Sequence, residues 1–180
     1  MNRSWRRLGY LGAPDLSKAE SEHEAFVSLL REAGAEVLYL DASQPLGMDA
    51  LYPRDASVIC RGGAVLGRMG KVSRMAEPAA HAAAYETLHV PVLGEISGEG
   101  RLEGGDVTWL DERTLAVGIG YRTNSEGVRQ LKDLLGDRID TAIEVPLPHW
   151  RGPGDVFHLM SMVSPLSDNV LLVYSPLLPV

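Results

Sequence analysis

Apolar residues recur at the spacing of one helix face in three stretches of the chain. The first stretch begins at Leu16, has charged residues between the apolar ones, and is followed by Gly34, a residue that commonly ends a helix. The second has Pro78 near its first turn, and the third has Asn124 or Ser125 as a candidate N-cap. The pattern predicts helices at residues 16–33, 79–88 and 125–135, and a short buried strand at residues 37–40.

Three further segments share one layout, in which a polar residue precedes a short apolar strand, a turn and a second apolar strand. They span residues 55–66, 106–117 and 158–173, and their first residues are 51 and 52 positions apart. A repeat of this length is typical of propellers and other radial arrays of small β-units. Any α/β protein contains hairpins, so chance recurrence is the alternative. The shared spacing, turn and polar first residue favour a true repeat.

Radial repetition brings corresponding strand ends to one axis, so Asp55, Asp106 and His158 are expected to lie close together. The same period gives a partial unit at residues 6–11 and a further unit beyond Val180. An array that stops between units exposes an apolar flank and an open sheet edge. We therefore expect residues 1–180 to form a single incomplete α/β propeller domain that lacks its C-terminal blades and self-associates through the open edge.

Composition, net charge and cysteine count exclude several classes of protein. The 180 residues are 45% hydrophobic, which is enough for a sizeable core, and the net charge of −7 argues against nucleic-acid binding. No apolar run is long enough to span a membrane, and the basic start is not followed by the apolar region of a secretion signal. A single cysteine, Cys60, rules out an internal disulfide and fits a reducing compartment. These features predict a cytoplasmic protein with neither nucleic-acid nor membrane partners.

Several carboxylates lie where a strand begins. Asp49 and Asp55 are six residues apart on a loop that enters a strand, and a pair of carboxylates can hold the planar fork of a guanidinium. Capping of turns is the alternative, and for Asp49 it is as plausible as binding. In Glu103-Gly-Gly-Asp106 the two glycines allow both carboxylates to turn inward.

His158 is the most chemically suggestive histidine, because it occupies the position that aspartate holds in the other two units. Arg74 and Arg122 each follow a hairpin and could pair with a substrate carboxylate, with internal ion pairs as the alternative. The sequence has no Cys/His spacing typical of a metal site and no glycine pattern typical of dinucleotide binding. We therefore predict neither a metal nor a cofactor.

Together these segments resemble the guanidine-modifying superfamily of dimethylargininases, arginine deiminases and amidinotransferases, and they are most similar to the dimethylargininase branch. The resemblance implies a five-bladed α/β propeller, the pentein fold, of which the chain would cover about three and a half blades. The residues that carry it occur in the family's order: Asp49 with Asp55, Gly62-Gly63, Arg74, Glu103-Gly-Gly-Asp106, Arg122-Thr123-Asn124 and His158-Leu159.

The resemblance also implies a reaction on a small guanidino substrate. A cysteine thiolate would attack the guanidinium carbon, and His158 would protonate the departing amine. The same histidine would then activate water, which releases citrulline from the Cys-bound alkylthiouronium intermediate. The implied catalytic residues are His158 and Glu103, and the implied substrate-binding residues are Asp49, Asp55, Arg74, Asp106 and Arg122.

Two departures from the family pattern bear on activity. Met160 stands where arginine deiminases carry an aspartate, which favours a methylated or otherwise substituted guanidine over arginine. The family's nucleophilic cysteine lies in a final blade, beyond the last residue here, and Cys60 in a strand interior is a poor substitute. We expect this chain alone to be inactive. An amidinotransferase and a non-catalytic arginine-binding module remain as alternatives.

Overall fold

The computed structural model describes residues 4–7, 9–41, 46–149, 152–153 and 157–178. Their contacts define two compact units, one that ends at Tyr39 and one that begins at Leu40, and each is described by itself. None of the helices in these ranges is long and apolar enough to cross a membrane. The prediction of one domain over residues 1–180 stays a prediction.

The first unit consists of two helices, α1 (Ser4–Arg7) and α2 (Leu16–Glu32). Asp15 caps α2, because its side chain accepts a hydrogen bond from the backbone N–H of Lys18 at 3.1 Å. Gly34, with a φ of 90°, follows the end of this helix. The predicted helix at residues 16–33 is thus confirmed to within one residue.

Two other predictions for the N-terminal region are wrong. Residues 37–40 form no strand, since none of the described residues pairs with them in a ladder and the side chains of Leu38 and Tyr39 are more than half exposed. The short apolar run is a loop, in which the Tyr39 hydroxyl donates a hydrogen bond to the carboxylate of Glu24 on α2. The partial β-unit at residues 6–11 is also wrong: Leu8 lies outside the described residues, Ser4–Arg7 is helical, and residues 9–11 form no strand.

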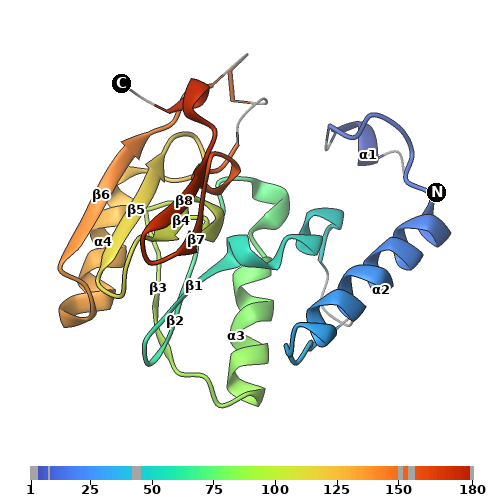
Figure 1. Ribbon diagram of the computed structural model, residues 1–180, viewed down its shortest axis with the longest axis horizontal. Helices are drawn as coiled ribbons and strands as arrows, with labels where there is room; N and C mark the ends of the chain where they lie inside the picture. The colour runs from blue at the N-terminus through green and yellow to red at the C-terminus, as the bar shows by residue number, and fades with distance from the viewer. Residues whose placement is uncertain (1–3, 8, 42–45, 150–151, 154–156, 179–180) are drawn as a thin grey trace. The chain divides into compact units, whose positions relative to one another are not determined.

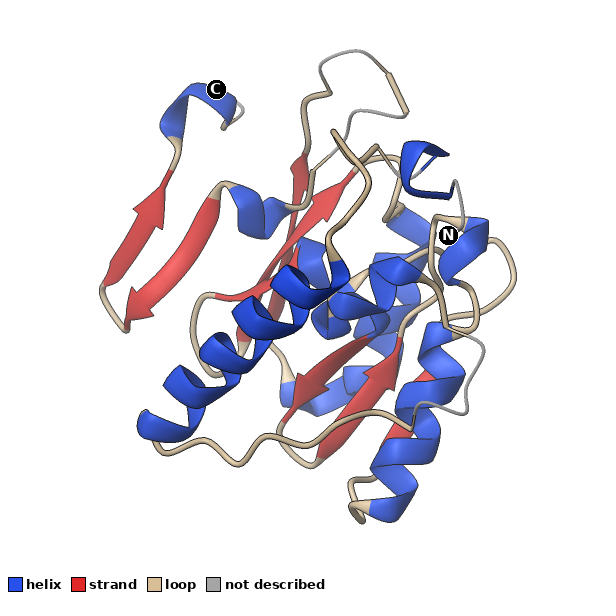
Figure 2. Cartoon of the chain, turned by 90° about the vertical axis from the view of Figure 1, so that its right-hand side faces the viewer, coloured by secondary structure: helices blue, strands red, loops and turns tan. Residues whose placement is uncertain are grey.

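The second unit repeats one motif, an antiparallel hairpin, a crossover helix and a third strand parallel to the second (Figure 1). The motif occurs twice in full, and a third hairpin follows that forms a sheet of only two strands (Figure 2). Its elements are β1 (Ser57–Cys60), β2 (Gly63–Leu66), α3 (Glu77–Thr87) and β3 (Val92–Glu95), then β4 (Val107–Trp109), β5 (Thr114–Ile119), α4 (Ser125–Leu135) and β6 (Thr141–Pro146), and finally β7 (Val163–Ser167) and β8 (Val170–Val173).

Short 3-10 turns connect these elements and place the polar residues that precede the strands. Those that matter for the site are η1 (Met48–Leu51), η2 (Pro53–Ala56), η3 (Val72–Arg74), η4 (Gly104–Asp106) and η6 (Leu159–Ser161). Two more turns are η5 (Gly136–Arg138), which follows α4, and η7 (Ser175–Leu177), which follows β8.

The three hairpins and the helices α3 and α4 are confirmed, and Asn124 is the N-cap of α4. The third strands β3 and β6 were not predicted. The burial of β6 does not alternate cleanly along the strand, so a period of two was not visible in its sequence. The result is a mixed α/β fold whose sheets are not closed into a ring, and the number of blades stays a prediction.

Two apolar clusters hold the repeats together. The larger joins the sheets of both complete motifs to α4 through fully buried side chains that include Val65, Leu102 and Leu131. The smaller joins the third hairpin to β5 through Leu159, Met162 and Ala116. Burial of one such leucine contributes about 1.5–3 kcal/mol. Because both clusters lie next to the 3-10 turns, they fix the positions of η2, η4 and η6 relative to one another.

Candidate active site

The site is built where the three repeats begin. Asp55 lies in η2 before β1, Glu103 directly precedes η4, and His158 directly precedes η6. The turns approach closely because η4 begins with two glycines. A Cβ on Gly104 would collide with the carbonyl oxygen of the residue before Asp55, and a Cβ on Gly105 would lie 2.5 Å from Asp55 Oδ1 and 2.7 Å from the His158 ring. Only glycine permits this convergence.

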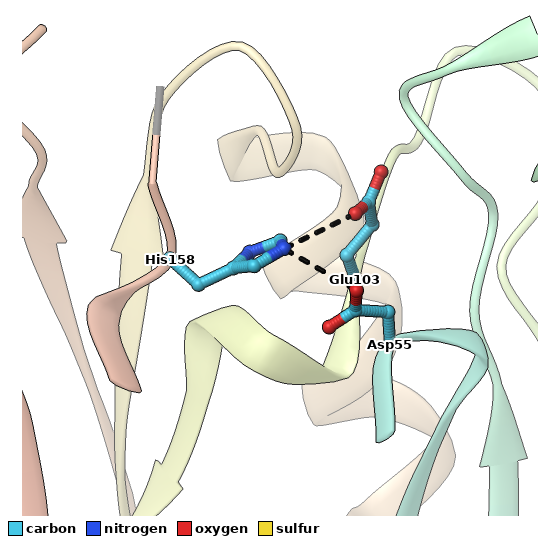
Figure 3. A group of neighbouring side chains, drawn as sticks. All are labelled: Asp55, Glu103 and His158. Atoms are coloured by element: carbon cyan, nitrogen blue, oxygen red, sulfur yellow. Dashed lines mark ion pairs between the residues drawn. The ribbon is translucent and has the colours of Figure 1, made fainter. Parts of the chain in front are cut away.

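The three side chains meet at His158 Nε2 (Figure 3). This nitrogen lies 3.5 Å from Asp55 Oδ2 and 3.5 Å from Glu103 Oε2. Glu103 is fully buried, Asp55 is buried, and the His158 side chain is 19% exposed. The expected convergence of the strand ends is thus seen in the structure, and it places an imidazole between two carboxylates.

Asp106 fixes the other side of the imidazole ring. Its Oδ1 lies 3.1 Å from His158 Nδ1 and also accepts the backbone N–H of Leu159 at 3.2 Å. Its Oδ2 accepts the hydroxyl of Thr123 at 2.6 Å, and that hydroxyl in turn accepts the backbone N–H of Glu103. Both oxygens of Asp106 are therefore engaged within the protein. This arrangement suits a residue that orients His158 more than one that contacts a substrate directly.

Arg74 lies at the end of η3 and is held by internal ion pairs. Its Nη1 contacts Asp55 at 2.6 Å, and its Nε and Nη2 form a two-pronged pair with Glu77 at 2.8 and 2.7 Å. Nη2 also donates to the carbonyl oxygen of Tyr52. With a side chain only 3% exposed, Arg74 is in the internal ion-pair state that was the alternative to binding a substrate carboxylate. Its predicted role as a carboxylate ligand stays a prediction.

Arg122 is the second cation of the cluster and binds Glu103. Its Nε lies 2.8 Å from Oε1 and its Nη2 lies 2.5 Å from Oε2, the fork geometry of a guanidinium on a carboxylate. Oε1 also accepts the backbone N–H of Gly70 at 2.8 Å.

Asp49 is the predicted residue that the structure does not join to this cluster. It lies in η1, is 7% exposed, and pairs with Lys71 at 3.3 Å. Within the part of the chain that the structure describes, its carboxylate forms no ion pair with His158, Arg74 or Arg122.

The surroundings shift the two central pKa values in opposite directions. Burial lowers the pKa of His158, but the hydrogen bonds and charges of Asp106 and Asp55 outweigh it and raise the pKa to about 9. Burial raises the pKa of Asp55, but His158 and Arg74 outweigh it and lower the pKa to about 2. At neutral pH the site therefore contains an imidazolium beside a carboxylate.

The charges of the cluster leave room for one more cation. Two guanidiniums and the imidazolium face more carboxylates than they can neutralise, namely Asp55, Glu77, Glu103 and Asp106. Ligand atoms of Asp55, Glu103 and His158 also lie within 4.8 Å of one another, a spacing that a metal ion could use. The guanidiniums already in contact with both carboxylates would repel a divalent ion more strongly than a singly charged organic cation. The carboxylate oxygens can also accept the N–H groups of a planar organic cation.

Three residues that shape the site were not predicted from the sequence. Glu77 follows Arg74 by three positions at the start of α3, a spacing that brings two side chains together on a helical turn. Thr123 was noted only as part of a resemblance, and nothing local announced its contact with Asp106. Lys71 carried no signal at all, because its partner Asp49 is distant in sequence.

Comparison with known proteins identifies the family. Residues 44–179 match the family model described as arginine deiminase. The chain belongs to the arginine deiminase family. The predicted membership of the guanidine-modifying superfamily is thereby confirmed.

Relatives agree with this assignment. A dimethylarginine dimethylaminohydrolase of Streptomyces coelicolor is 34% identical over 166 residues, which cover 91% of this chain and 60% of that protein. A solved structure of the dimethylarginine dimethylaminohydrolase of Pseudomonas aeruginosa, a cysteine-to-serine mutant in complex with citrulline, is 26% identical with a TM-score of 0.76. The match covers 91% of this chain and 61% of that one.

An amidinotransferase of saxitoxin biosynthesis from Microseira wollei has a TM-score of 0.73 at 17% identity, over 95% of this chain and 60% of that one, which shows a common fold alone. The chain spans about 60% of the length of the Streptomyces relative and of both of these structures.

Proposed function

We propose that the chain supplies the substrate cradle and the general acid–base of an enzyme that hydrolyses a guanidinium C–N bond. The proposed substrate is arginine methylated on the guanidinium, with dimethylarginine giving citrulline and dimethylamine. One observation carries the proposal, the placement of His158 Nε2 between the carboxylates of Asp55 and Glu103. Membership of the arginine deiminase family supports the reaction class.

The proposed roles follow from charge and position. Asp55 and Glu103 accept N–H groups of the guanidinium, which enters as the cation that the cluster lacks. A cysteine thiolate attacks the guanidinium carbon and forms a C–S bond, and His158, protonated at neutral pH, gives its proton to the amine as the C–N bond breaks. The neutral imidazole then takes a proton from water, whose oxygen attacks the same carbon and displaces the sulfur of the intermediate. Asp106 keeps the ring oriented through both steps by its contact with Nδ1.

The proposed nucleophile is a cysteine thiolate from outside these 180 residues. Cys60 does not suit the role, because it is half-buried against the larger apolar cluster and burial raises the pKa of its thiol. The chain alone is then inactive. For Asp49 and Arg74 to serve as substrate ligands, as the family resemblance implies, the substrate has to exchange with their present partners. These are Lys71 for Asp49, and Asp55 and Glu77 for Arg74.

Citrulline release tests this proposal, with dimethylarginine and arginine offered in parallel. The 180-residue chain should release citrulline from neither. Release that Cys60→Ser abolishes would overturn the external nucleophile. A form of the protein that carries the nucleophile should prefer dimethylarginine, since Met160 offers no carboxylate to an unsubstituted guanidinium.

The two alternatives give different results in the same assay. Added glycine that becomes a guanidino product, with no citrulline, would favour an amidinotransferase. Binding of arginine without any turnover, in the form that carries the nucleophile, would favour a non-catalytic module.

A further inference from the structure

Glu103, the most deeply buried carboxylate of the site, is already occupied by a guanidinium of the chain itself. Arg122 grips it through Nε and Nη2 at 2.8 and 2.5 Å, the same two-pronged geometry that a guanidino substrate would use. We infer that Arg122 is a displaceable stand-in for the substrate guanidinium and selects for guanidines that also carry a carboxylate. The inference rests on the proposed function, since it takes Glu103 as a substrate ligand.

Arg122 is the mobile member of the pair. Glu103 is held from two sides, by the backbone N–H of Gly70 on Oε1 and by the Thr123 hydroxyl on its own backbone N–H. The Arg122 guanidinium pairs, among the described residues, with Glu103 alone, and its side chain is 12% exposed where that of Glu103 is fully buried. An arginine at the border of solvent with one partner can rotate away, whereas its carboxylate cannot follow.

Arg74, the other guanidinium of the cluster, cannot play this part. It is fixed by three separate acceptors, Glu77, Asp55 and the carbonyl oxygen of Tyr52, and it approaches Glu103 no closer than 3.9 Å. Displacing Arg74 would take the guanidinium from two buried carboxylates at once, Glu77 and Asp55, and leave Asp55 with His158 alone, which is costly. Displacing Arg122 frees only Glu103, and the incoming guanidinium takes its place there.

Motion is confined to the side chain of Arg122. The backbone of Arg122 packs against Gly70 so closely that a Cβ there would lie 2.9 Å from the Arg122 Cα. The displaced guanidinium therefore stays near the site and needs a new anion. A substrate that brings its own carboxylate provides one, whereas a guanidine without a carboxylate leaves the displaced cation unpaired.

The exchange therefore makes binding of the two ends of the substrate interdependent. A ligand has to break the ion pair between Arg122 and Glu103, which costs free energy. This cost is offset only if the carboxylate of the ligand binds the released Arg122. L-Arginine and agmatine differ in this one group, since agmatine is arginine without the carboxylate. Arg122 should thus favour L-arginine over agmatine, because only L-arginine can pair with the released guanidinium.

Calorimetric titration of both ligands into the 180-residue chain and its Arg122→Met variant tests this inference. Methionine keeps an unbranched stem of similar length and removes the charge and the fork. The variant should bind agmatine about tenfold more tightly, because nothing closes Glu103, and it should no longer prefer L-arginine over agmatine. Arg129→Met, at an arginine on α4 with a 60% exposed side chain, is the matched control and should leave both affinities unchanged.

Other outcomes overturn the inference in distinguishable ways. Unchanged agmatine affinity with weaker L-arginine binding would mean that Arg122 contacts the carboxylate but does not close Glu103. Weaker binding of both ligands would mean that Arg122 maintains the site. If neither ligand binds wild type or variant, the proposed function fails together with the inference.

A second measurement does not depend on the fold of the variant. The Nε–H proton of Arg122 in the wild-type chain should exchange slowly with water in NMR spectra, and the addition of L-arginine should shift its resonance. A resonance that exchanges as fast as those of exposed arginines would overturn the inference whatever the ligands do.

Discussion

The Asp106→Asn substitution gives the sharpest prediction about the chemistry of His158. Asp106 holds the imidazole by a contact of 3.1 Å at Nδ1, and its hydrogen bond comes first among the contributions that raise the pKa of His158 from 6.5 to about 9. Asparagine keeps the shape of the side chain and removes its charge. An opposite charge at this distance shifts a pKa by about 1–3 units. The pKa of His158 should therefore fall by about that amount in the variant.

The assay is a pH titration of histidine side chains by NMR, with the His158 signals assigned through a His158→Gln variant. Asp137→Asn, at an exposed carboxylate in η5, is the control and should leave the titration of His158 unchanged. A pKa of His158 that stays within about 0.3 units in Asp106→Asn would refute the reasoning, since a nearby charge is expected to contribute more than that. A pKa of His158 near 6.5 in the wild-type protein would also refute the reasoning, since the carboxylates around the ring would then not raise it.

Three more predictions concern stability and assembly. The folded pKa of His158, about 9, lies above its value of 6.5 in an unfolded chain, so its contribution of about 3 kcal/mol is complete below pH 6.5 and is lost as the pH rises through 9. The free energy of unfolding measured by urea denaturation should be lower at pH 10 than at pH 6. This difference should be smaller in His158→Gln. Gly105→Ala should lower the free energy of unfolding by about 1–3 kcal/mol, because the new Cβ meets Asp55 and His158, whereas Gly120→Ala has its nearest atom at 3.7 Å and should cost less. The four residues of β8 are all 45% exposed or more, so the chain should self-associate, and a monomer at every concentration in sedimentation would contradict this.

Much of the fold could be predicted because its information is local. Helices α2, α3 and α4 show apolar residues at helical spacing, and Asn124 and Gly34 mark helix ends by their own backbone chemistry. The hairpins show short apolar runs around turns. The strand β6 could not be found in this way, because its place beside β5 is set by the crossover through α4 and its exposed positions do not alternate with a period of two.

The site was predictable to the extent that the repeat was. The period of the polar residues that precede the strands correctly brought Asp55, Asp106 and His158 together, although they are about 50 positions apart. The pairing of charges was not predictable, since it depends on side-chain geometry between segments. The sequence allowed an internal ion pair for Arg74 and has Glu77 three positions later, but nothing in it indicated that Arg74 would also bind Asp55, or that Lys71 would bind Asp49.

The central claim, that a guanidinium binds at the carboxylates around His158, is tested most directly by titrating dimethylarginine into the 180-residue chain and its Glu103→Gln variant in a calorimeter. The account predicts saturable binding that Glu103→Gln weakens at least about tenfold, because a buried carboxylate becomes a neutral amide. Glu99→Gln, at an exposed position four residues earlier, should bind as the wild type does. Equal binding by the wild type and Glu103→Gln, or no binding by either, would contradict the claim.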